Sequence, residues 1–241
     1  MRGKVREVDL KNLTVVLLAG DPKCLNLIPP ARRESYLERA LEELRPLGCP
    51  IVLVNHPDVR PPVPIRMMTS VPSGEILFDS VAAGLAACAT DYILLLATDL
   101  PLITTAAVRE FCGQACLNGA ELSIALADLA ACEALGRTTN HPIPLAGRKY
   151  KFGSAFVFRR EATGRILATT QNLLGLRKQP IRLVYQFLSW RCLLSLARFV
   201  LSFRFLKLAL RFDEAEQLIA QQVGIHTRGV VTSPFLAIDD D

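Results

Sequence analysis

The chain has 241 residues and 51% of them are hydrophobic, which is enough for one large domain or two small ones with a sizeable core. Its net charge of +5 is small for a nucleic-acid-binding surface, so no nucleic acid is expected and an anionic, phosphate-bearing partner is favoured. Residues 1–12 are charged and lack the apolar segment of a secretory signal, which predicts a cytoplasmic protein.

Short apolar runs alternate with helical patterns along most of the chain. The predicted strands cover residues 13–20, 50–55, 65–71, 92–97, 121–127 and 150–160. The predicted helices cover residues 35–48, 74–89 and 104–119 and nearly all of residues 161–222, and residues 229–241 are predicted to be extended. This alternation over short links is typical of a three-layer α/β/α, Rossmann-like fold with a mostly parallel sheet. We interpret residues 1–241 as a single domain.

Acidic residues follow two of the apolar runs. The strand YILLLA leads into Thr98-Asp99, and the chain ends in LAIDDD, which contains Asp239. The first strand ends at Gly20, where the backbone can turn tightly. Because ligands gather at the carboxyl ends of parallel strands, we expect Gly20, Asp99 and Asp239 to share one edge of the sheet.

Two neighbouring carboxylates repel each other unless a cation lies between them, and Mg²⁺ prefers carboxylate, phosphate and water oxygens. An aspartate pair that faces a glycine turn is therefore consistent with a site for Mg²⁺ and a nucleoside triphosphate. An alternative remains open, in which Asp99 only caps the helix that follows Pro101 and the acidic tail is solvated.

Several segments, in this order, resemble the MobA-like nucleotidyltransferases, which have a GT-A-like NTP transferase domain. The segments are VVLLAG, LFDSVAAGLAACATDYILLLATDLPLIT with its D-x-P motif, and FLAIDDD. Two more, GRKYKFGSAFVF and RKQPIRLVYQFL, are similar to a bacterial subgroup with a helical insertion, which would cover about residues 161–222 here. The resemblance spans nearly the whole chain.

The resemblance implies an Mg²⁺-dependent enzyme that transfers a nucleoside monophosphate from a nucleoside triphosphate to a phosphorylated small-molecule acceptor and releases pyrophosphate. Asp99 and Asp239 would hold the metal and take part in catalysis, with Asp241 as an alternative to Asp239. The nucleotide would be bound by Leu18, Ala19, Gly20, Lys23, Ser80 and Gly84. The acceptor would be bound by Arg148, Lys149 and Gly153.

The sequence departs from this family in the loop that follows the first strand. Asp21 stands where the family has a second glycine, and Lys23 lies about two residues away from the position of the family's lysine. Backbone amides at glycines and a lysine are the usual phosphate-binding groups of such a loop. The departure leaves an alternative open, a catalytically degenerate nucleotide-binding or scaffold protein with the same fold.

Residues 181–212 are apolar and basic, and they account for the positive mean hydropathy of the chain. Their longest uncharged run, residues 183–190, is far shorter than the roughly 20 residues that span a bilayer. Three interpretations remain open: the segment packs on its own domain, forms a homodimer interface, or binds an anionic membrane surface peripherally.

Cysteine and histidine residues give no pattern of a metal site. The seven cysteines are an odd number without a C-x-x-C pair, so we expect buried, reduced thiols. The three histidines, His56, His141 and His226, are scattered and are not expected to share a catalytic role.

Overall fold

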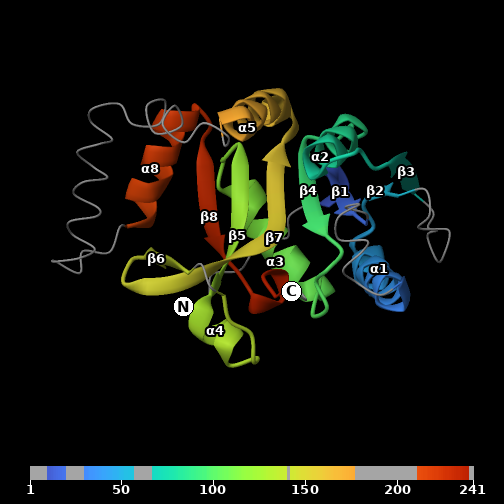
Figure 1. Ribbon diagram of the computed structural model, residues 1–241, viewed down its shortest axis with the longest axis horizontal. Helices are drawn as coiled ribbons and strands as arrows, with labels where there is room; N and C mark the ends of the chain where they lie inside the picture. The colour runs from blue at the N-terminus through green and yellow to red at the C-terminus, as the bar shows by residue number, and fades with distance from the viewer. Residues whose placement is uncertain (1–9, 20–29, 57–66, 140–141, 177–210, 239–241) are drawn as a thin grey trace.

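The computed structural model describes residues 10–19, 30–56, 67–139, 142–176 and 211–238. Within these residues, eight strands form one sheet (Figure 1). They are β1 (Leu13–Leu18), β2 (Ile51–Asn55), β3 (Met68–Pro72), β4 (Tyr92–Ala97), β5 (Leu122–Asp128), β6 (Ile143–Leu145), β7 (Arg148–Arg159) and β8 (Thr227–Val231). The order across the sheet is β3-β2-β1-β4-β7-β5-β8, and β6 pairs with β7.

The sheet is mostly parallel, as predicted. β1 pairs in parallel with β2 and β4, β2 pairs in parallel with β3, and β5 pairs in parallel with β8. β7 is antiparallel to both β4 and β5, between which it lies. The carboxyl ends of β1, β4, β5 and β8 therefore lie along one edge of the sheet, which is the lower edge in Figure 1.

Helices cover both faces of the sheet. They are α1 (Pro30–Leu44), α2 (Leu77–Ala86), α3 (Thr105–Leu117), α4 (Leu129–Glu133), α5 (Thr163–Leu176) and α8 (Phe212–Val223). Short 3-10 turns are η1 (Leu10–Asn12), η3 (Arg45–Leu47), η4 (Arg160–Ala162) and η5 (Pro234–Leu236). The described part of the chain thus has the three-layer α/β/α arrangement.

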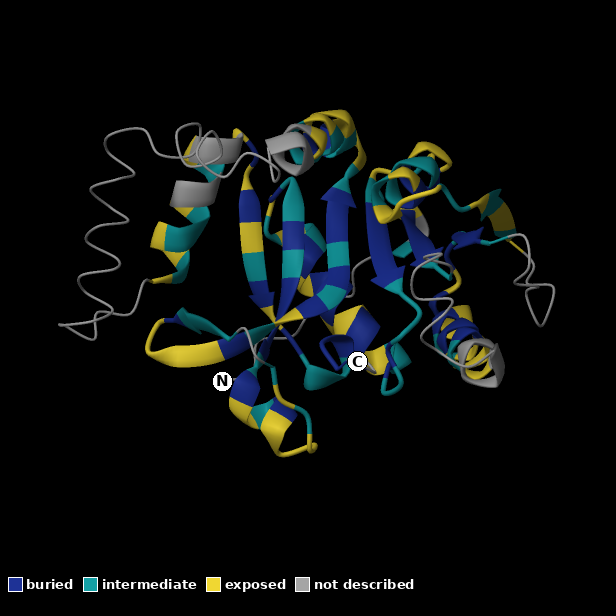
Figure 2. Cartoon of the chain, in the orientation of Figure 1, coloured by how far each residue is buried: buried dark blue, intermediate teal, exposed yellow. Residues whose placement is uncertain are grey.

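Alternation along the strands explains the two helical layers. Val15 and Leu17 of β1 belong to the buried cluster that includes residues of α1 and α3, whereas Val16 belongs to the cluster that includes residues of α2 and α5. Successive side chains of a strand point to opposite faces, so a strand buried on both faces reads as a continuous apolar run. Figure 2 shows the resulting concentration of buried residues in the central strands.

Most predicted strands and helices are present, and the largest differences lie in the second half of the chain. The predicted extended segment at the C-terminal end contains β8 and then η5, where Pro234 occupies the first turn and the hydroxyl of Ser233 accepts a hydrogen bond from the N–H of Phe235 (3.4 Å). The short elements α4 and β6 were missed. Of the region predicted to be helical, α5 and α8 are described, whereas residues 177–210 lie outside the described residues.

Among the described residues, no helix is both long enough and apolar enough to cross a membrane. The segment 181–212 falls almost wholly outside them, so its three interpretations stay predictions.

Candidate functional site

The end of β4 carries Asp99 to the edge of the sheet beside β1. Leu18 of β1 pairs with Ala97 of β4, and both the backbone N–H and the hydroxyl of Thr98 donate to the carbonyl of Leu18, at 3.2 and 3.0 Å. Ala19, which directly follows β1, donates its N–H to the carbonyl of Val54 in β2 (2.8 Å). These bonds join the ends of three strands and place Asp99 close to the end of β1.

Asp99 does not cap the helix that follows it, so that alternative interpretation is wrong. Helix α3 begins at Thr105, and its cap is Thr104, whose hydroxyl accepts a hydrogen bond from the N–H of Ala107 (3.2 Å). Asp99 lies in the turn before Leu100, and its Oδ1 atom is shielded from solvent. A carboxylate oxygen held away from water fits a hard cation, because the cation compensates the lost hydration of the charge.

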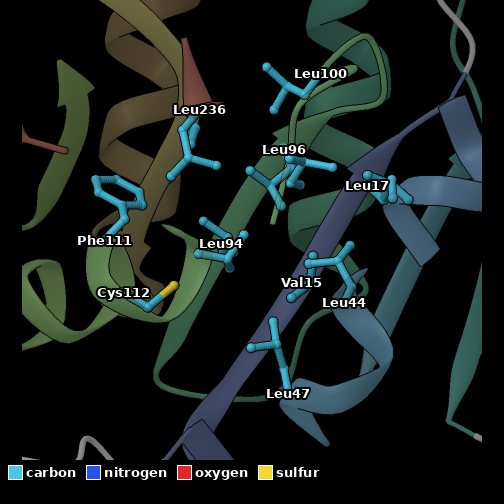
Figure 3. Packing of buried hydrophobic residues seen from close by; sticks show 14 of the residues in the cluster. Val15, Leu17, Leu44, Leu47, Leu94, Leu96, Leu100, Phe111, Cys112 and Leu236 are labelled. Carbon is cyan, nitrogen blue, oxygen red and sulfur yellow. The ribbon is translucent and has the colours of Figure 1, made fainter. Parts of the chain in front are cut away.

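A second segment approaches this turn from the C-terminal end of the chain. Leu236 is fully buried in the same cluster as Leu96 and Leu100, and Figure 3 shows these side chains pointing toward one another. Ile238 is also fully buried, in a small cluster against which Leu102 packs. The residues that lead into Asp239 therefore pack with the residues that follow Asp99.

Several of the predicted site residues are among those whose placement is not described. Asp239, Gly20 and Lys23 lie outside the described residues, so the predicted carboxylate pair and phosphate loop stay predictions. Leu18 and Ala19 are described and half-buried at the end of β1, where they were expected.

Ser80 and Gly84 have structural contacts on α2. The hydroxyl of Ser80 accepts a hydrogen bond from the N–H of Gly74 (3.0 Å) and so holds the turn between β3 and α2. A Cβ atom at Gly84 would lie 2.5 Å from Val16 Cγ1 and 2.8 Å from Val54 Cγ2. The glycine therefore allows α2 to lie close against β1 and β2, while the nucleotide-binding roles of both residues stay predictions.

The hairpin of β6 and β7 brings positive charge to the same edge of the sheet. Its turn is formed by Ala146 and Gly147, both with positive φ (49° and 77°), as a two-residue hairpin turn of type I′ requires. Arg148 follows the turn and pairs with Asp128 at the end of β5 (3.3 Å), and Lys149 is exposed beside it. The predicted acceptor-binding cations are thus near the carboxyl end of β5.

Gly153 of β7 lies deeper than its predicted role at the acceptor suggests. The residue is buried, and a Cβ atom there would lie 2.7 Å from the carbonyl oxygen of Leu236. The sequence did not indicate this contact, because it joins two segments that are far apart in the chain. The predicted contact of Gly153 with an acceptor is not addressed by this packing and stays a prediction.

A cavity of about 530 Å³ lies at the opposite end of β4. It is lined by Asp91, Tyr92, Arg159, Arg160 and Glu161. The guanidinium carbon of Arg159 lies 6.0 Å from the centre of the Tyr92 ring, and its Nη1 pairs with Glu161 (3.2 Å). Two carboxylates balance the two guanidinium groups of this lining, so the cavity does not offer the excess positive charge that a triphosphate requires.

None of the described cysteines forms a disulfide, and the predicted burial is confirmed for most of them. They are Cys49, Cys88, Cys112, Cys116 and Cys132, and all but the half-buried Cys116 are buried. Burial raises the pKa of Cys88 and of Cys116 to about 11, which suppresses the reactive thiolate at neutral pH. Within the described ranges, no three or more His, Cys, Asp or Glu side chains are grouped to hold a metal ion.

The fold brings the carboxyl ends of its parallel strands, and with them Asp99, to one edge of the sheet, where α/β proteins bind their ligands. Residues 19–199 match the family described as the MobA-like NTP transferase domain. Because this match covers more than half of the sequence, the chain belongs to the MobA-like NTP transferase family. A comparison with proteins of curated function finds no match.

Solved structures share the fold at low sequence identity. A hypothetical transferase from Thermus thermophilus has a TM-score of 0.72 at 22% identity, over 95% of this chain and 96% of that one. The 4-diphosphocytidyl-2C-methyl-D-erythritol synthase of Anaerococcus prevotii has a TM-score of 0.54 at 11% identity, over 95% and 91%. The 2-C-methyl-D-erythritol 4-phosphate cytidylyltransferase of Francisella tularensis has a TM-score of 0.53 at 13% identity, over 95% and 94%.

Proposed function

We propose that this protein is an Mg²⁺-dependent nucleotidyltransferase that acts on a phosphorylated small molecule. An oxygen of the acceptor's phosphate would attack the α-phosphorus of a nucleoside triphosphate, and the bond to the leaving pyrophosphate would break. The observation that carries the proposal is the fixed position of Asp99 beside the end of β1, in a chain of the NTP transferase family.

The residues at the end of β1 would receive the nucleotide. Leu18 and Ala19 end this strand beside Asp99, and Gly20 and Lys23 follow in the sequence. Asp99 and Asp239 would hold Mg²⁺, which when bound neutralises phosphate charge during transfer. The contribution of the chain is then to orient the phosphates and to keep the carboxylate of Asp99 in place.

The β6–β7 hairpin would receive the acceptor. Arg148 and Lys149 are exposed there, and Arg148 is held by its pair with Asp128. A phosphate group on the acceptor complements these cations. Because the Francisella protein is named for a methylerythritol phosphate, polyol phosphates belong in the first panel of acceptors, together with sugar phosphates.

Pyrophosphate release tests the proposal directly. The purified protein is incubated with Mg²⁺, each of the four nucleoside triphosphates and each acceptor, and released pyrophosphate is measured. We expect release with one nucleotide and acceptor class, and we expect Asp99→Asn to lower it roughly 10³-fold, because the variant loses a charged ligand of the metal.

Asp91→Asn is the matched control, since Asp91 precedes β4 and Asp99 follows it, so that the same substitution is made at opposite ends of one strand. Unchanged turnover in Asp99→Asn would remove Asp99 from the mechanism.

Asp21 in the phosphate loop favours a second candidate, a nucleotide-binding protein without turnover. Calorimetric binding of Mg²⁺–nucleotide without pyrophosphate release from any acceptor would support that candidate.

A further inference from the structure

Strand β7 is irregular around Gly153. Ile124 of β5 pairs with Phe156, and two residues further along β5, Leu126 pairs with Phe152. Three residues of β7, Gly153 to Ala155, therefore lie opposite one residue of β5, and the pairing of β7 with β4 ends at Ala155. A bulge of this kind bends a strand, and Figure 1 shows β7 turning away from β4 toward the hairpin.

The bulge leaves no space for a side chain at position 153. A Cβ atom there would lie 2.7 Å from the carbonyl oxygen of Leu236, 2.8 Å from Ala125 Cβ and 3.1 Å from the carbonyl oxygen of Ala125. Two of these three atoms belong to the backbone, which cannot rotate out of the way as the end of a side chain can. An added methyl group would therefore have to displace the backbone of Leu236 or of β5.

Displacement of Leu236 would be transmitted to the turn that carries Asp99. Leu236 shares a buried cluster with Leu100, the residue that follows Asp99, and Leu102 packs against the cluster of Ile238. All of these side chains except Leu102 are almost completely buried. Because closely packed protein interiors transmit small shifts, a displaced Leu236 would move the residues next to Asp99.

We propose that Gly153 is a positioning residue for the phosphate and metal site around Asp99. Its missing side chain lets the segment 234–238 lie against the turn 99–102, and this contact fixes the direction of the Asp99 carboxylate. The inference rests on the proposed function, because it takes Asp99 as the metal ligand. It differs from the predicted role of Gly153 as an acceptor contact, since it acts through the C-terminal segment.

The test is Gly153→Ala, with two measurements on the full chain at a temperature at which it is folded. Hydrogen exchange is followed at the amides of residues 98–102, of which Pro101 has none, and of residues 235–238. Mn²⁺ binding in the presence of a nucleoside triphosphate is titrated by electron paramagnetic resonance. We expect exchange to become about tenfold faster in both segments and the Kd for Mn²⁺ to rise about tenfold or more.

Two other glycines provide matched controls. A Cβ atom at Gly229 would meet the Leu126 side chain at 2.7 Å, so Gly229→Ala imposes a similar crowding in β8, but on a side-chain atom. A Cβ atom at Gly164 would have no neighbour within 4 Å among the described residues, so Gly164→Ala controls for the added methyl group alone. Both variants should leave Mn²⁺ affinity and exchange at residues 98–102 unchanged.

The outcomes separate this inference from the proposed function. If the parent protein binds Mn²⁺ and Gly153→Ala binds it equally well, or if the variant only lowers the Tm without faster exchange at residues 98–102, Gly153 is not a positioning residue. If the parent itself binds no Mn²⁺, the proposed function fails, and the role of Gly153 at a metal site fails with it.

Discussion

On one side of the candidate site, the ends of β1 and β4 are joined by strand pairing and by two hydrogen bonds from Thr98 to Leu18. On the other side, the segment 234–238 is held by the packing of Leu236 and Ile238 and by the close approach of Leu236 to Gly153. The first side depends on neighbouring parallel strands, whereas the second depends on contacts between distant parts of the chain. The backbone that leads into Asp99 is therefore held by strand pairing, whereas the residues that precede Asp239 are held by packing between distant parts of the chain.

The largest effect is expected from a truncation in the hydrophobic core that both sides share. Phe111 of α3 is fully buried in the cluster that contains Leu96 and Leu236. We expect Phe111→Ala to lower the free energy of unfolding by about 3–5 kcal/mol, because the truncation leaves a cavity. Denaturant unfolding followed by circular dichroism measures the change.

The control for this truncation is Leu117→Ala at the end of the same helix, where the side chain is 60% exposed and the expected change is within about 0.5 kcal/mol. A loss of less than about 1 kcal/mol in Phe111→Ala would contradict a shared core.

Gly84→Ala perturbs the first side alone. The added methyl group would crowd Val16 and Val54 beneath α2, and we expect a loss of about 1–3 kcal/mol in the free energy of unfolding. The clusters around Leu236 and Ile238 do not include these valines, so hydrogen exchange at residues 235–238 should stay as in the parent. Faster exchange there would show that the packing of residues 235–238 also depends on the face of the sheet that α2 covers.

Glu43 gives a smaller, pH-dependent effect where α1 meets the start of α3. Its Oε2 accepts a hydrogen bond from the backbone N–H of Thr105 (2.7 Å), and the hydroxyl of Thr105 lies 2.8 Å from the same oxygen. These contacts, the backbone one first, lower the pKa of Glu43. The charged carboxylate therefore stabilises the folded chain above the ordinary glutamate pKa of about 4.3, and this contribution is lost as the pH falls through the lower folded value.

We expect Glu43→Gln to lower the free energy of unfolding by about 1 kcal/mol at pH 7, and the difference from the parent to shrink below about pH 4. Glu42→Gln, at the exposed neighbouring position, should show neither effect. A difference from the parent that does not change between pH 7 and pH 3 would argue against a charged contact at Thr105.

The two sides also differ in how well they could be predicted from the sequence, because one depends on local patterns and the other on contacts between distant residues. The apolar runs of β1 and β4 and the position of Asp99 after β4 could be predicted, because strand periodicity is local and parallel strands end at one edge. The contact of Gly153 with Leu236 could not be predicted. A glycine in a strand indicates that another part of the chain can approach closely, but it does not indicate which part.

Other features of the fold were hidden for similar reasons. The three-residue strand β6 is too short for a periodic pattern, and its hairpin turn uses Ala146 where Asn or Asp is usual. The sequence left open whether Asp99 caps the following helix, because that depends on where the helix begins, which is Thr105 in the structure.

The most direct test of the central claim is a titration of Mn²⁺, as a substitute for Mg²⁺, in the presence of a nucleoside triphosphate. The parent, Asp99→Asn and Asp91→Asn are compared under identical conditions. Our account predicts that Asp91→Asn binds Mn²⁺ as the parent does and that Asp99→Asn binds it at least about tenfold more weakly, because a charged ligand is lost. Equal affinity in all three proteins would contradict the assignment of Asp99 as a metal ligand.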